Sequence, residues 1–361
     1  MSNRKHNFSA GPCTLPVSVL EEAQKEFVDY QGAGMSLIEM SHRGKHFDAV
    51  ANEAMVLSKE VYGAPDDFSV LFLQGGALLQ FSMVPMNLLG AGDKAAYVNS
   101  GTWAKGAITD AREYGSVYLA WDGESDNFTR MPLSNELQLK DNTRYLHITS
   151  NETIGGIRVH EWPDVNIPLV GDMSSDYMSR PIPWDKFDLV YGGVQKNLGP
   201  AGMAVVFIRK SILEHTNRDI GRYLRYDIQE EKGSMFNTPP VFTIYMLGKV
   251  LKWMKAEGGL QAMEQNAIKK SGLLYDAIDS SGSFYNCPVE VASRSHMNVV
   301  FRLPSEDLEQ KFIAEAAQSD LLNLKGHRSV GGCRASIYNA LPYESVAALV
   351  DFMQTFQKTN G

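Results

Sequence analysis

The stretch Leu189–Ile208, LVYGGVQKNLGPAGMAVVFI, contains two apolar runs separated by a glycine-rich loop. Leu189–Tyr191 and Met203–Ile208 are short and rich in apolar residues, which predicts two buried strands. The loop between them holds one cation, Lys196. Burial there would disfavour the charged ammonium, lower the pKa of Lys196 and leave its amine able to act as a nucleophile. A solvated turn lysine is the alternative interpretation, and the residues predicted to surround Lys196 decide between the two.

Short apolar strands recur upstream of this stretch. Four are predicted at 70–73, 95–98, 145–149 and 167–170. The first two are followed by glycine-containing turns and then by helices, one at about 77–89 and one that ends before Gly115. This alternation is typical of a mostly parallel sheet covered by helices on both faces. We therefore predict an α/β fold.

The last third of the chain has a different pattern. A long helix at Val241–Ala256 begins after two prolines and ends before Gly258-Gly259. Beyond it, helices and short strands predict a smaller α+β unit. Because 361 residues exceed one ordinary domain, we predict three parts: an N-terminal arm at 1–16 that packs with the small domain, a large domain at 17–258, and a small C-terminal domain at 259–361.

Composition restricts the partners and the compartment. The net charge is -8 and no basic block offsets it, which argues against a nucleic-acid partner. The N-terminus lacks an apolar signal core, and no run of about 18 apolar residues predicts a membrane span. Three cysteines, Cys13, Cys287 and Cys333, have unrelated spacings, so neither a disulfide framework nor a metal site is predicted. We expect a cytoplasmic protein.

Several groups with distinct chemistry directly follow the predicted strands. Ligands bind at the carboxyl ends of the strands in open parallel sheets, so we expect these groups to lie together. They are Gly75-Gly76-Ala77-Leu78, Trp103, Thr153, Asp172 and Gln195-Lys196. One site would thus hold an amine, a carboxylate, a flat aromatic ring, a hydroxyl and a helix start bordered by glycines.

Pyridoxal phosphate uses all five groups. Its aldehyde needs an amine such as that of Lys196, and its pyridine nitrogen stays protonated beside a carboxylate such as Asp172. Its ring can stack on Trp103, its phenolic oxygen can bond Thr153, and its phosphate suits the helix start after Gly76. Taken singly, each group has a plainer interpretation, namely a tight turn, a core tryptophan, a helix cap or a turn aspartate. Their convergence favours the cofactor.

Eight segments carry a resemblance to a known family. They are NFSAGP, MSHRGK, QGGALLQF, TSNETIGG, GDMSSDYMSRP, GGVQKNLGPAG, GSMFNTPP and KGHRSVGGCRASIYNA, and they run from about Asn7 to the C-terminus. In this order they resemble the phosphoserine aminotransferase family, which belongs to class V of the fold-type I pyridoxal-phosphate enzymes. The resemblance implies reversible transfer of the amino group of glutamate to 3-phosphohydroxypyruvate, giving O-phosphoserine and 2-oxoglutarate in serine biosynthesis. It also implies a 4-phosphohydroxythreonine branch in pyridoxine biosynthesis, in organisms that use it.

The resemblance assigns a role to each matching cofactor residue. It implies that Lys196 forms the Schiff base and that Asp172 is the partner of the pyridine nitrogen. Three further roles are implied: stacking by Trp103, a phenolic-oxygen bond from Thr153, and phosphate contacts from Ala77 and Leu78 with help from Gln195. Asn237 and Thr238 match residues that reach the cofactor of the other subunit, which implies a homodimer.

The substrate carries a carboxylate and a phosphate. A bidentate arginine suits the carboxylate, and Arg334 matches the family residue for that task. His42 and Arg43, together with His327 and Arg328, resemble the cluster that receives the substrate phosphate. Some relatives have an arginine in the loop that reads Ala77-Leu78-Leu79 here, so phosphate binding would depend more on these four residues.

The expected mechanism is a ping-pong transamination in which the Lys196 amine moves the proton and Asp172 keeps the ring nitrogen protonated.

Two other functions are weighed against this one. Another class V activity, such as cysteine desulfuration or alanine–glyoxylate transamination, is the nearest alternative. Desulfuration needs a mobile nucleophilic cysteine, whereas Cys333 lies between Gly332 and Arg334, where packing explains it better. A non-catalytic phosphate-binding protein is the other alternative. It would have no use for Lys196, and the sequence has no GxxxxGK[ST] motif.

Overall fold

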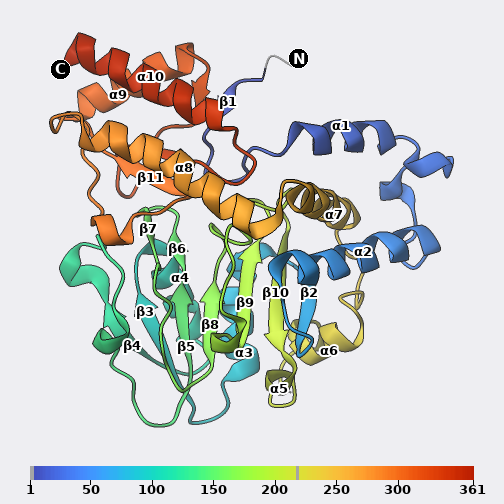
Figure 1. Ribbon diagram of the computed structural model, residues 1–361. Helices are drawn as coiled ribbons and strands as arrows, with labels where there is room; N and C mark the ends of the chain where they lie inside the picture. Colours follow the sequence, from blue (N-terminus) through green and yellow to red (C-terminus); the bar gives the residue numbers. More distant parts are fainter. Residues whose placement is uncertain (1–3, 217–218) are drawn as a thin grey trace.

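A computed structural model describes residues 4–216 and 219–361, so residues 1–3 of the predicted arm lie outside the described residues. At its centre is a seven-stranded sheet in the order β2-β10-β9-β8-β5-β3-β4 (Figure 1). The strands of this sheet are β2 (Phe68–Gln74), β3 (Lys94–Asn99), β4 (Ser116–Asp122), β5 (Thr143–Thr149), β8 (Leu169–Asp172), β9 (Leu189–Gly193) and β10 (Met203–Arg209). The predicted α/β class is confirmed.

The sheet is mostly parallel. Strands β4, β3, β5, β8 and β9 run in one direction, and β10 is antiparallel to both β9 and β2. The carboxyl end of β2 therefore lies at the same edge as those of the parallel strands, where Gln74 pairs with Met203. Strand β4 was not predicted, although Val117–Trp121 is a continuous run of apolar and aromatic residues; it is an edge strand whose residues are mostly half-buried or exposed.

Helices cover both faces of the sheet, and side chains alternate between them. On β2, Phe68 and Phe72 join the core under α2 and α7, whereas Leu71 and Leu73 join the core under α3 and α4. The helices in the large part of the chain are α1 (Val17–Glu26), α2 (Lys45–Tyr62), α3 (Gly76–Leu88), α4 (Thr102–Ala111), α5 (Lys210–Leu213), α6 (Tyr226–Glu231) and α7 (Val241–Ala256). Both strand faces are thus buried, as the apolar runs predicted.

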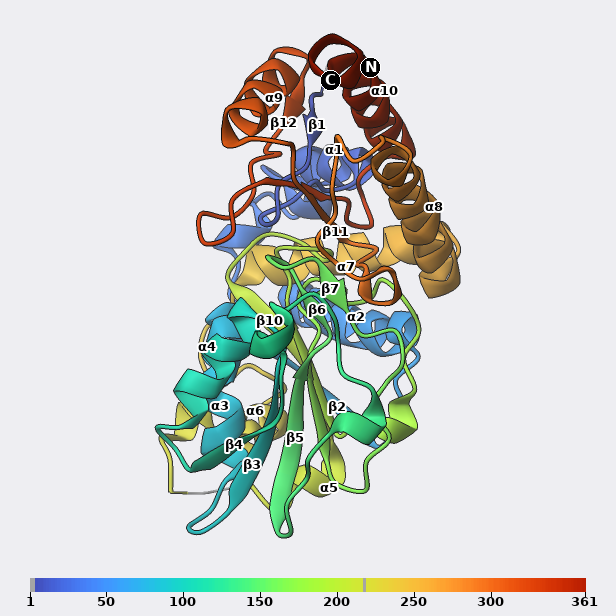
Figure 2. The same ribbon diagram turned by 90° about the vertical axis from the view of Figure 1, so that its left-hand side faces the viewer.

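The C-terminal part packs across the carboxyl end of the sheet (Figures 1 and 2). Its elements are α8 (Gly259–Asp279), β11 (Asn298–Phe301), α9 (Glu306–Gln318), β12 (Leu321–Leu322), β13 (Cys333–Ser336) and α10 (Tyr343–Asn360). Two short strands, β6 (Asn151–Glu152) and β7 (Ile157–Arg158), form a hairpin at the junction. The site described below lies between this part and the sheet.

The N-terminal arm adds a strand to the C-terminal part. Its strand β1 (His6–Asn7) pairs in parallel with β12, and Phe8 is buried in the C-terminal core. Helix α8 contributes Leu260 and Met263 to the core of the large part and Leu274 to the C-terminal core. The two cores therefore meet along α8, and the predicted boundary at 258 stays a prediction.

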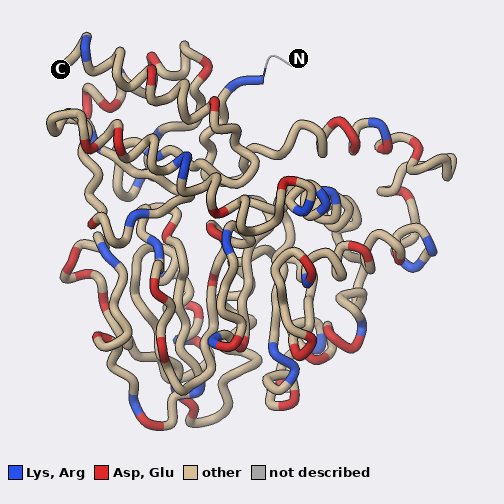
Figure 3. The backbone as a smooth tube through the Cα atoms, viewed as in Figure 1, with Lys and Arg blue, Asp and Glu red and all other residues tan. Residues whose placement is uncertain are grey.

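Residues of both signs of charge are spread along the chain. Lysines and arginines are interspersed with aspartates and glutamates along the described chain (Figure 3). Among the helices of the described residues, we find none with the length and apolar character needed to cross a membrane.

Candidate active site

Lys196 lies in the loop between β9 and β10, at the carboxyl edge of the sheet. Its side chain is 8% exposed, and its Nζ donates a hydrogen bond to Thr153 Oγ1 at 2.7 Å. Burial lowers the pKa of Lys196 to about 8, although the carboxylates of Asp172 and Glu152 oppose the shift. At neutral pH the site therefore holds a far larger share of neutral amine than an exposed lysine would.

Asp172 ends the neighbouring strand β8. Its Oδ1 accepts hydrogen bonds from the backbone N and the Oγ of Ser174, at 2.9 and 2.6 Å. Burial raises the pKa of Asp172, and the bonds from Ser174 and the charge of Lys196 work against that rise. The carboxylate is thus oriented and partly stabilised before any ligand arrives.

Trp103 and Thr153 form two walls around the amine. The Trp103 ring, in the first turn of α4, has its centroid 5.5 Å from Lys196 Nζ. Thr153 follows β6, and its backbone oxygen accepts a hydrogen bond from Arg334 Nη1 at 3.1 Å. Arg334 lies on β13, so this bond ties the C-terminal part to the wall that faces Lys196.

The start of α3 opens into the same space. Gly75 and Gly76 have φ values of 90° and 65°, and a Cβ on Gly75 would lie 2.7 Å from the Leu79 side chain. These glycines allow the sharp turn from β2 into α3 and leave the N–H groups of its first turn unpaired within the helix. Such a terminus favours an anion.

One cavity of about 320 Å³ joins these groups. Its lining includes Gly11, Ala77, Leu78, Trp103, Thr153, Asp172, Gln195, Lys196, His327 and Arg334. Three lining side chains, Thr149, Trp103 and Gln195, each have a buried polar atom without a hydrogen-bond partner among the described residues. A polar ligand would satisfy such atoms, and together with the amine and carboxylate they fit pyridoxal phosphate.

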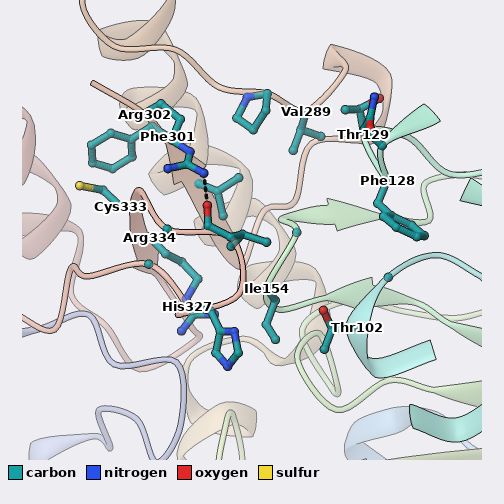
Figure 4. A pocket seen from close by; sticks show the side chains of 18 of the residues that line it. Thr102, Phe128, Thr129, Ile154, Val289, Phe301, Arg302, His327, Cys333 and Arg334 are labelled. Carbon is teal, nitrogen blue, oxygen red and sulfur yellow. Dashed lines mark hydrogen bonds between the residues drawn. The ribbon is translucent and has the colours of Figure 1, made fainter. Parts of the chain in front are cut away.

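A second cavity of about 220 Å³ adjoins the first and shares Ile154, His327 and Arg334 with it (Figure 4). Its other walls are mostly apolar and include Phe128 beside α4 and Phe301 on β11. The guanidinium of Arg334 therefore lies where the two cavities meet.

Not every predicted residue lines the cofactor cavity. His42, Arg43, Arg328, Asn237 and Thr238 are absent from its lining. His42 and Arg43 precede α2, and Arg328 is exposed beside His327. The backbone oxygen of Thr238 accepts a hydrogen bond from Gln74 at 2.8 Å. The predicted four-residue phosphate cluster is therefore not assembled around this cavity by one chain.

Two contributions were missed by sequence analysis. Glu152 is fully buried beside the site and accepts hydrogen bonds from the backbone N–H groups of Trp103 and Ala104. The N-terminal arm also reaches the lysine loop, where Cys13 N donates to Gln195 O at 3.2 Å. The SNET segment contained a signal for Glu152, since a carboxylate directly before the site hydroxyl is unusual in a buried segment.

Comparisons with known proteins agree with this geometry. The aminotransferase class-V family model matches residues 5–349. The phosphoserine aminotransferase of Desulfosudis oleivorans is 52% identical, over 100% of both chains. A solved phosphoserine aminotransferase from Bacillus circulans subsp. alkalophilus superposes with a TM-score of 0.98 at 51% identity, over 100% of both chains. The pyridoxal-phosphate-bound enzyme from Trichomonas vaginalis gives 0.93 at 39% identity, over 97% of this chain and 100% of that one. The chain belongs to the class-V aminotransferase family.

Proposed function

We propose that the protein is a pyridoxal-phosphate-dependent transaminase that transfers the amino group of L-glutamate to 3-phosphohydroxypyruvate, giving O-phospho-L-serine and 2-oxoglutarate. One observation carries the proposal: the buried Lys196 amine faces Thr153, Trp103 and Asp172. The chain that builds this arrangement is 52% identical to a phosphoserine aminotransferase over 100% of both chains. This activity places the protein in serine biosynthesis.

The residues of the cavity divide the chemistry between them. When bound, pyridoxal phosphate supplies an electron sink for the carbanion formed at the substrate α-carbon. Lys196 Nζ would take the proton from that carbon and deliver it to the aldehyde carbon of the cofactor, which a pKa of about 8 permits near neutral pH. The carboxylate of Asp172 favours a protonated ring nitrogen. Thr153 Oγ1 holds Nζ within the cavity at 2.7 Å.

Substrate recognition is assigned to the C-terminal part. Arg334 lies at the junction of the two cavities, and its planar guanidinium suits the carboxylate shared by both substrates. His327 lines both cavities and is a candidate contact for the phosphate. Arg328, next to it, is the predicted second contact.

The remaining predicted residues are assigned to a second subunit. His42, Arg43, Asn237 and Thr238 do not line the cavity of their own chain, and we assign them to the cavity of the partner in a homodimer. Large apolar side chains exposed between α1 and the middle of α2 support such an interface. They are Phe27 (46% exposed), Val28 (80%), Met35 (46%), Ile38 (50%) and Val56 (64%).

A steady-state assay of the purified protein tests the proposal. With L-glutamate as donor, we expect turnover with 3-phosphohydroxypyruvate and formation of 2-oxoglutarate. Glyoxylate, the acceptor of the alternative class V transaminases, should give at least about a hundredfold lower kcat/KM, because it lacks the phosphate. Equal turnover with both acceptors, or none with either, would contradict the proposal.

A further inference from the structure

Helix α4 begins without a capping side chain of its own. Its N-cap residue is Gly101, and its first turn contains no acidic residue. The N–H groups at the start of a helix need acceptors from elsewhere. Glu152, about fifty positions later in the chain, supplies them: its carboxylate accepts from Trp103 N at 3.1 Å and from Ala104 N at 2.9 Å.

The carboxylate of Glu152 is fully buried. Burial raises its pKa to about 7, and the two backbone N–H bonds oppose that rise. The positive end of the helix dipole favours the ionised form. A third donor, Ser100 Oγ, lies 3.4 Å from Oε1. All the hydrogen bonds that Glu152 accepts come from the start of α4 or the residue just before it, so this buried side chain fixes the orientation of that end of the helix.

Gly101 makes room for this contact. A Cβ at position 101 would lie 2.9 Å from Cδ of Glu152, and the φ of Gly101 is 156°. Any larger residue would push the carboxylate of Glu152 away from the N–H groups of Trp103 and Ala104, from which it accepts hydrogen bonds. The glycine and the glutamate therefore act as one unit.

Glu152 also stands directly before Thr153, the hydrogen-bond partner of Lys196. We infer that Glu152 is a positioning residue, which fixes the distance between Trp103 on α4 and Thr153 after β6 across the cofactor cavity. The side chain of Glu152 binds the start of α4, which carries Trp103, and its backbone leads directly into Thr153. This inference rests on the proposed cofactor, because Trp103 and Thr153 are the walls on either side of the reactive amine.

The test uses the purified holoenzyme and the variant Glu152→Gln. The amide keeps the shape of the side chain but presents an N–H₂ group to one of the two backbone N–H groups, so one capping bond is lost. The matched control is Glu124→Gln. Glu124 is exposed and forms an ion pair at 3.4 Å with Lys105, which lies on α4. Hydrogen exchange of residues 101–106 reports on the helix terminus, and visible circular dichroism reports on the bound cofactor.

In Glu152→Gln we expect exchange at 101–106 to become about tenfold faster, since one capping bond is worth about a factor of ten. The visible circular dichroism should change, and kcat should fall by about tenfold with KM for glutamate within about twofold, because Arg334 is untouched. Glu124→Gln should match the wild type. Gly101→Ala is the second variant: Glu152 is unmutated, but its carboxylate is displaced by the added Cβ, so the same exchange and dichroism changes are expected.

Exchange and circular dichroism unchanged from the wild type in both variants would overturn the inference. The exchange measurement distinguishes this result from failure of the proposed function. A wild-type protein without phosphoserine transamination would refute the function, whereas the exchange of 101–106 still tests the contact made by Glu152.

Discussion

Lys196 combines a buried amine with one hydroxyl partner and two nearby carboxylates. Desolvation favours the neutral amine, whereas Asp172 and Glu152 favour the ammonium, and desolvation is the larger effect. The resulting pKa of about 8 separates Lys196 from exposed lysines, whose ordinary value is 10.5. These surroundings keep a large share of the amine neutral near that pH, as the proposed roles of nucleophile and proton carrier require.

The lowered pKa of Lys196 predicts how the rate of cofactor binding depends on pH. The rate at which cofactor-free protein captures pyridoxal phosphate should rise with pH and level off above about 8, because below that value Nζ is protonated and lacks a free electron pair. Stopped-flow absorbance measures the rate. A rate that keeps rising toward the ordinary lysine pKa would show that Lys196 is solvated, and Lys196→Ala should show no specific capture.

Arg334 is the second residue whose role can be measured. Arg334→Lys keeps the charge but loses the planar fork, so KM for glutamate and for 3-phosphohydroxypyruvate should each rise about tenfold or more. The control is Arg112→Lys, an exposed residue after α4, which should leave both values unchanged. Unchanged KM for both substrates in Arg334→Lys would refute the carboxylate role.

The short strands at the junction are joined by a buried polar network. Asn298 on β11 accepts from Asn151 Nδ2 at 2.8 Å and donates to Ser336 Oγ and Tyr338 OH, at 2.9 and 3.1 Å. Asn151 belongs to β6, and Ser336 to β13, the strand of Arg334. One amide thus links the strand of Arg334 to the hairpin that leads into Thr153.

Asn298→Ala should therefore weaken both stability and binding. It leaves buried partners unpaired, and we expect the free energy of unfolding to fall by about 1–3 kcal/mol, measured by urea denaturation. KM for glutamate should rise as β13 loses its anchor. Asn266→Ala on the exposed face of α8 is the control, with a change within about 0.5 kcal/mol. Equal stability of the two variants would contradict this interpretation.

The elements differ in how far the sequence predicts them. Helix α7 and strand β9 follow from an apolar run bounded by proline or glycine, which is a local signal. Strand β4 also has an apolar run, Val117–Trp121, but its place at the sheet edge depends on pairing with β3, which the local sequence does not show. The capping role of Glu152 was also missed, because its partners lie in helix α4 and only the folded chain brings them together.

Lys196 and Asp172 were predicted because the ends of neighbouring parallel strands meet at one edge, where the structure places both.

The molecule as a whole places the cavity between the sheet edge and the C-terminal part, with the arm beside it. Ala10 and Gly11 line the cavity, and β1 pairs with β12. Five predicted site residues lie outside the lining of their own chain's cavity. Four of them, His42, Arg43, Asn237 and Thr238, are those that we assign to the partner in the proposed homodimer.

Mixed dimers test that assignment. Lys196→Ala and the double variant His42→Ala/Arg43→Ala should each be inactive or severely impaired alone. After dissociation and random pairing, about a quarter of the wild-type sites should be restored, because half of the dimers contain one site with every native group. Activity that does not recover, in dimers shown to have exchanged subunits, would mean that both sets of residues serve the same chain.

The half-reaction of the holoenzyme tests the central claim most directly. O-phospho-L-serine, L-glutamate and L-alanine are added in turn, without a keto acid, while the visible spectrum of the cofactor is followed. We predict a full spectral change with O-phospho-L-serine and with L-glutamate and almost none with L-alanine at the same concentration. No change with O-phospho-L-serine, or an equal change with L-alanine, would contradict the account.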